Sequence, residues 1–159
     1  MSKSTREQFL NPPRTGTRTC ETQEEWLLRA IAILDWYFSE LDKPIPSILI
    51  RKECLGDADQ YTIMGQCQQF WYMDTKPPQI HEARIFIAPD VVEDLQVLEI
   101  LVHELAHAVL PEGVQHGEPF KDLADKLGLE GKITSTYAGT KLRIKLLNIS
   151  NTLGPYPEN

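Results

Sequence analysis

The sequence predicts an α+β fold in which an N-terminal helix packs on a small sheet and three further helices follow. The chain has 159 residues, enough for one domain with a single hydrophobic core. Three short β-rich segments follow one another without a helical pattern between them. Because parallel neighbours need a crossover connection, we expect an antiparallel or mixed sheet of about three strands, mostly antiparallel.

The first helix is predicted over residues 22–41. Thr22 and Glu25 have the spacing of a capping box, in which each side chain binds a free amide at the helix start. Apolar residues then recur at intervals of three and four, which is typical of a helix with one buried face. Pro44 cannot continue this helix.

The three strands are predicted at residues 47–52, within residues 66–73, and at residues 84–88. Pro89 ends the third segment, which is apolar almost throughout. We expect this third segment to leave an exposed edge that pairs with an extended substrate. The sheet is expected to lie on the first helix.

A second helix is predicted to begin near Val91, with Asp90 as its N-cap and Glu93 at the third helical position. It continues to residue 110, and Pro111 ends it. Its second half is apolar on nearly every side. A helix of this kind lies in the centre of a domain.

Two further helices complete the predicted fold. Pro119 suits the first turn of a short helix, and Gly128 suits the left-handed residue that follows its end. The last helix is expected over about residues 140–152 and ends before Gly154. We therefore divide the chain into a flexible segment (1–20), one domain (21–153) and a C-terminal tail (154–159).

The predicted buried helix contains the sequence His-Glu-Leu-Ala-His, which carries the candidate chemistry. His103 and His107 are four residues apart, so both imidazoles project from one helix face and can reach one metal ion. Glu104 lies about 100° around the helix, where it could reach a metal-bound water. Burying these side chains alone would cost several kcal/mol, and a metal ion removes much of that cost. We therefore expect a metal site.

A catalytic zinc site has three protein ligands and one open position. His116 is the first candidate for the third ligand, because the turn at residues 111–113 can fold the chain back beneath the helix. Glu112, Glu118 and Asp122 remain alternatives. Spacing alone does not choose among them.

Two segments, residues 101–108 (LVHELAHA) and 115–120 (QHGEPF), resemble the SprT-like (Spartan-type) zinc metallopeptidases. This resemblance implies a zincin-like fold and hydrolysis of peptide bonds by a zinc-activated water. It implies that Glu104 is the catalytic acid and base. The implied ligands of one Zn²⁺ ion are His103, His107 and His116.

Two residues beyond the last candidate ligand could stabilise the oxyanion of a peptidase reaction. Tyr137 has a phenol and Arg143 a guanidinium, and both are donors suited to a developing negative charge. We treat them as candidates beside the metal.

Two other functions remain open. A protein that uses zinc only for stability, as an interaction module, would have four protein ligands and no use for Glu104. A protease acting on DNA-bound proteins would need contacts to phosphates. The formal net charge is −7 and the acidic residues are concentrated in residues 21–131, which repels nucleic acid, whereas the two ends are mildly basic.

Cysteine usage and composition indicate the setting. Cys20, Cys54 and Cys67 form neither a CxxC pair nor an even disulfide set, so we expect reduced thiols. Residues 1–20 lack the apolar core of a secretory signal, and no apolar run suits a membrane span, so we expect a cytoplasmic protein. No cysteine follows Cys67, and residues 153–157 resemble the tails of small phage-encoded SprT-like proteins that lack a zinc ribbon.

Overall fold

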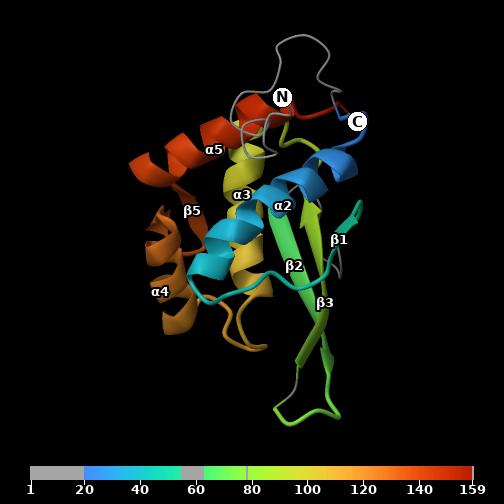
Figure 1. The fold of residues 1–159 in the computed structure, drawn as a ribbon, viewed down its shortest axis with the longest axis vertical. Coiled ribbons are helices and arrows are strands. Elements are labelled where there is room, and N and C mark those ends of the chain that lie inside the picture. The colour runs from blue at the N-terminus through green and yellow to red at the C-terminus, as the bar shows by residue number, and fades with distance from the viewer. Residues whose placement is uncertain (1–19, 55–62, 78, 159) are drawn as a thin grey trace, which may run out of the picture.

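The computed structural model describes residues 20–54, 63–77 and 79–158 (Figure 1). The predicted α+β class and the order of the helices and the first three strands are confirmed. Almost all of the expected flexible segment, residues 1–20, lies outside the described residues. Along the chain the elements are α2 (Gln23–Glu40), β1 (Ile48–Arg51), β2 (Gly65–Tyr72), β3 (Gln79–Ile87), α3 (Asp94–Ala108), α4 (Glu118–Leu127), β4 (Leu129–Lys132), β5 (Ser135–Ala138) and α5 (Thr140–Leu153).

The main sheet is mixed, with the strand order β1-β3-β2. β3 runs parallel to β1 and antiparallel to β2. A mixed sheet was one of the two expected arrangements, but antiparallel pairs do not predominate, because one of the two pairs is parallel. β2 runs opposite to β1 and pairs with β3 on the side away from β1. The chain reverses again between β2 and β3, so β3 runs in the same direction as β1. The segment at residues 84–88, expected at an edge, belongs to the central strand.

α3 lies at the centre of the domain, as its all-round apolar pattern predicts (Figure 1). It packs against β2 and β3 on one side and against α4, α5 and β5 on the others. The side chains of Leu101, Val102 and Leu105 are fully buried. In the described part of the chain, no helix has the length and apolar character needed to cross a bilayer.

The start of α3 differs from the prediction. Its N-cap is Glu93, without a side-chain cap bond, and Asp90 is exposed. The amide of Val91 donates to the Ala88 carbonyl over 3.1 Å. This turn places the Val91 side chain in the core, and the helix therefore begins three residues later than predicted, at Asp94.

The ends of two other helices agree with the sequence in most respects. The Glu25 amide donates to Thr22 Oγ1 over 3.1 Å, which is half of the expected capping box. The Glu25 carboxylate accepts instead from the Glu21 amide, one residue before the cap. Pro119 lies in the first turn of α4, and Gly128 ends it with φ 92°, a left-handed conformation that suits glycine.

The residues after α5 fold back on α2 and α3. The two carboxylate oxygens of Asp94 accept from the Ser150 hydroxyl and the Tyr156 amide, each over 2.8 Å. The Trp26 indole donates to the Gly154 carbonyl over 2.9 Å, and its ring meets that of Tyr156 at 5.0 Å. Gly154 and Tyr156, in the segment expected as a C-terminal tail, therefore contact α2 and α3.

A second, two-stranded sheet, formed by β4 and β5, was not predicted. Its strands have four residues each and are mostly exposed, so they carry no alternating apolar pattern. The Glu99 carboxylate of α3 accepts from the Ala138 amide over 3.1 Å. This bond holds β5 against α3, beside the predicted metal ligands.

Candidate metal centre

Three imidazoles meet at one point beside α3. His103 and His107 project from the same face of the helix, and His116 reaches them from the loop before α4. The Nε2 atom of His116 lies 3.2 Å from that of His107 and 3.3 Å from that of His103. Two nitrogens that bind one zinc ion tetrahedrally lie about 3.3 Å apart. The three histidines could therefore hold one metal ion.

The protonation of these side chains also suits a metal. Burial, together with the nearby His116, lowers the pKa of His103 to about 4. Burial, together with both neighbouring imidazoles, lowers the pKa of His107 to about 4. Both rings are therefore neutral at pH 7, the state in which imidazole binds a metal ion. Imidazole ligands suit several transition metals, so the donor set alone does not identify the ion.

His103 is oriented by a residue of the unpredicted hairpin. Its Nδ1 lies 2.8 Å from Thr136 Oγ1 on β5. With Nδ1–H donating to this hydroxyl, the lone pair of Nε2 faces the other two imidazoles. A bond of this kind sets the tautomer and the ring orientation of a metal ligand. Nothing in the sequence pattern connected Thr136 with His103.

Phe120 of α4 forms the base of the site. Its fully buried ring is stacked on that of His107, with centroids 4.3 Å apart. It also lies 4.9 Å from the His103 ring and 5.1 Å from the His116 ring. One aromatic side chain thus contacts all three imidazoles and limits their movement.

The loop between α3 and α4 brings His116 back to the helix, as expected from the turn at residues 111–113. The Val114 amide donates to the Pro111 carbonyl over 3.4 Å, and the Gly117 amide to the Val114 carbonyl over 3.0 Å. Gly113 has φ 84°, a left-handed conformation that favours glycine. These two consecutive turns reverse the chain.

The alternative third ligands lie elsewhere. Glu112, Glu118 and Asp122 are all exposed. Among the described residues, the only group of three close ligand atoms is that of the histidines. His116 is therefore the residue that the fold brings to the pair on α3.

Glu104 lies beside the histidines and is nearly buried, with 7% of its surface exposed. β2 passes so closely over it that a Cβ at Gly65 would lie 3.0 Å from Glu104 Oε1 and 2.5 Å from Ile100 Cγ2. A side chain at Gly65 would therefore collide with α3. Burial raises the pKa of the Glu104 carboxyl to about 8. The carboxyl therefore keeps its proton in most molecules at pH 7, and its pKa lies close enough to neutrality for it to exchange that proton with water.

The raised pKa of Glu104 predicts how Glu104→Gln alters stability without metal. The folded chain keeps a proton that the unfolded chain releases above about pH 4.5. This contribution to stability is complete below pH 4.5 and is lost as the pH rises through about 8. The glutamine variant has no carboxyl group at this position, so its free energy of unfolding does not fall in this way. The difference in free energy of unfolding between the variant and the unaltered protein should therefore change in favour of the variant by a few kcal/mol, as an order of magnitude, between pH 4 and pH 8.

Urea unfolding in a chelator at pH 4, 6 and 8 measures this difference. The histidines are the same in both proteins, so their titration cancels. Glu40→Gln, at an exposed carboxylate at the end of α2, serves as the control for the removal of one surface carboxylate. A pH-independent difference for Glu104→Gln would contradict the raised pKa.

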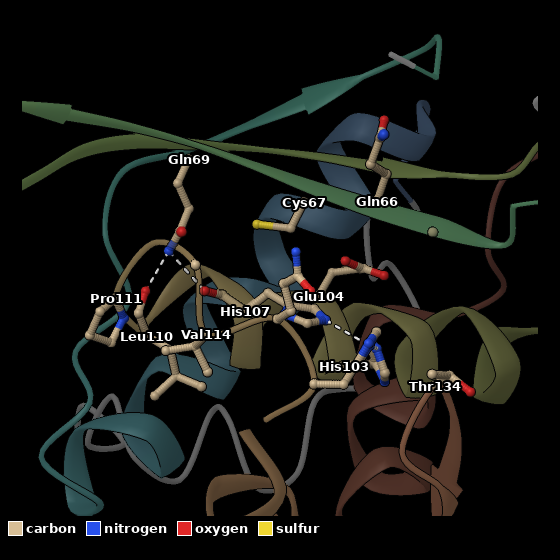
Figure 2. A pocket seen from close by; sticks show the side chains of 14 residues that line it. Gln66, Cys67, Gln69, His103, Glu104, His107, Leu110, Pro111, Val114 and Thr134 are labelled. Carbon is tan, nitrogen blue, oxygen red and sulfur yellow. Dashed lines mark hydrogen bonds between the residues drawn. The ribbon is translucent and has the colours of Figure 1, made fainter. Parts of the chain in front are cut away.

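Two connected hollows meet at the site. The first, of about 420 Å³, is lined by the three histidines, Glu104 and residues of β2 and the 110–116 loop (Figure 2). The second, of about 620 Å³, lies between α3, the start of β2 and the β4–β5 hairpin. The residues shared by both hollows are Gly65, His103, Glu104 and Thr134.

The remaining candidate residues are placed differently by the fold. Tyr137 lines the second hollow, with 52% of its surface exposed. Arg143 is exposed on α5 and lines neither hollow. Cys67 lines the first hollow, and burial, with a smaller effect of Glu104, raises the pKa of its thiol to about 12. Like Cys20 and Cys54, it is not in a disulfide.

Comparisons of the chain with protein-family models, with curated proteins and with solved structures each give no match.

Proposed function

We propose that this protein is a zinc-dependent metallopeptidase of the SprT-like type. One observation carries the proposal: three imidazole Nε2 atoms converge beside a buried carboxyl group in an open hollow. Three histidines leave a fourth tetrahedral position for water, which distinguishes a catalytic zinc site from a structural one. A protein that used zinc only for stability would gain nothing from a buried Glu104.

A zinc ion held by His103, His107 and His116 would supply a Lewis acid and a bound water with a pKa near 7. Glu104 would accept the proton of the attacking water and deliver it to the departing amine nitrogen. Its raised pKa suits both steps, because the group can take up and release a proton near neutrality.

The shape of the site supports an extended polypeptide as the substrate. β2 is one of the two edge strands of the main sheet in the described residues, and the β4–β5 hairpin lies across the second hollow from it. Glu104 is part of the lining of both hollows. An edge strand can pair with the main chain of a substrate. We therefore assign the pairing with an extended substrate to β2 and not to residues 84–88, which belong to the central strand.

Tyr137 is the proposed second donor to the oxyanion. It lines the same hollow as His103 and Glu104, and its phenol can donate a hydrogen bond. Arg143 has no such position, since it lies on the exposed side of α5.

Metal analysis combined with a cleavage assay tests this function. We expect one zinc ion per chain, cleavage of casein or of the chain itself, loss of cleavage in a chelator, and recovery on adding zinc. Parallel assays with single-stranded DNA test the DNA-associated alternative, which requires stimulation that weakens with salt. Stoichiometric zinc without cleavage of any substrate would favour the non-catalytic alternative.

A further inference from the structure

The side chain of Gln69, on β2, reaches across to the end of α3 (Figure 2). Its Nε2 atom donates to three backbone carbonyls: that of His107 over 2.8 Å, that of Ala108 over 3.2 Å and that of Leu110 over 2.6 Å. An amide group has two N–H bonds, so at least one of them is shared between carbonyls.

The carbonyls at the end of α3 depend mostly on donors outside the helix, although that of His107 also accepts from the Leu110 amide over 3.3 Å. The last four carbonyls of a helix have no partner within it. The chain reaches Pro111 three residues after the end of α3, and proline has no amide hydrogen to offer. The last turn of α3 contains no Lys or Arg, and its basic residue is His107, whose ring belongs to the metal group. Gln69 supplies a further donor to these carbonyls from another element.

The three acceptors lie on both sides of the junction between helix and loop. The His107 carbonyl belongs to the last turn of α3, whereas the Leu110 carbonyl belongs to the segment that leads to His116. Binding both to one amide group fixes the position of the loop relative to the helix. The imidazoles of His107 and His116 are carried by these two parts, and their Nε2 atoms lie 3.2 Å apart.

We propose that Gln69 is a positioning residue of the metal centre, which keeps His107 and His116 in the geometry that binds one ion. The inference rests on the metal centre of the proposed function but not on peptidase activity. It assigns to β2 a second role besides forming one wall of the site. Residues that orient metal ligands typically change metal affinity by 10–100-fold when they are replaced.

Two substitutions separate positioning from packing and from charge. Gln69→Met keeps a side chain of similar length and removes the donor. Gln69→Glu keeps the shape, removes the donor and adds a negative charge near the ion. If charge alone mattered, the glutamate would strengthen binding of a cation. The proposal predicts that both variants bind Zn²⁺ about tenfold more weakly or worse.

The neighbouring Gln68 provides a matched control. Its Oε1 accepts from Arg51 Nη1 over 3.1 Å, and the strand alternation directs it to the opposite face of the sheet. Gln68→Met loses one hydrogen bond in the same strand and should leave zinc affinity within about twofold of the unaltered protein.

Zinc affinity is measured by competition with a chromophoric chelator, and the absorption spectrum of the Co²⁺-loaded protein reports the geometry of the ligands. Circular dichroism and the metal-free Tm check the fold. Equal zinc affinity of Gln69→Met and the unaltered protein, or tighter binding by Gln69→Glu, would overturn the proposal. So would metal-free variants that are unfolded and are not restored by zinc, because Gln69 would then have a general structural role.

The unaltered protein separates this inference from the proposed function. If it binds no metal, both the metal centre and the role of Gln69 are overturned. If it binds zinc, the variants show the predicted weakening and no substrate is cleaved, then the role of Gln69 is supported and only the peptidase function fails.

Discussion

Glu104→Gln is expected to lower the rate of peptide hydrolysis about 10²–10⁴-fold while the protein still binds one zinc ion. The amide has the shape of the carboxyl group and fits the same confined place beneath Gly65. It cannot accept a proton from water or pass one to the leaving amine. The three imidazoles are unchanged, so the metal affinity should be close to that of the unaltered protein.

The rate is measured as kcat/KM on a fluorogenic peptide, and the metal content on the same sample. Glu40→Gln is the control, since this carboxylate is exposed at the end of α2 and lies outside both hollows. Cleavage by Glu104→Gln at the rate of the unaltered protein would show that another group transfers the proton. Loss of zinc from the variant would instead make Glu104 part of the metal site.

His116→Ala is expected to remove most of the stabilisation that zinc gives to the folded protein. Binding to the folded state alone adds about 2.7 kcal/mol when the free metal concentration is 100 times Kd. For a chain of this size, such a gain raises Tm by roughly 5–10 °C. Without the third imidazole, the remaining pair on α3 should bind zinc so weakly that the shift disappears.

Thermal unfolding with and without zinc provides the measurement, and the shift in Tm, rather than Tm itself, is compared. His81→Ala is the control, because His81 is the remaining histidine of the chain and lies outside the sequence pattern of the predicted ligands. A zinc-dependent shift that persists in His116→Ala would transfer the third position to Glu112, Glu118 or Asp122.

Local patterns predicted the helices better than they predicted the sheet. The periodicity that begins after Thr22 and the left-handed glycine at position 128 are properties of neighbouring residues, and both appear in the structure. The direction of β1 relative to β3 depends on which side of β3 is taken by β2. That choice depends on packing between strands far apart in sequence, so no short pattern reveals it.

In the metal centre, too, some features follow from local sequence patterns and others only from contacts between distant segments. The four-residue spacing of His103 and His107 placed both rings on one helix face, and the turn after Leu110 indicated that His116 could return to them. Thr136 and Gln69, by contrast, come from β5 and β2. Their contacts exist because the hairpin and the sheet edge pack on opposite sides of α3. Such contacts leave no trace in sequence spacing.

The sequence by itself determined that α3 is buried and that it carries two imidazoles and a carboxyl group on adjoining faces. A helical repeat is a local property, and burial of those groups without partners would be too costly to persist. Only the tertiary structure decided which residues hold the ligands in place and how the hollows open around Glu104. These features arise where separate elements meet, and the positions of those elements follow from how the whole core packs.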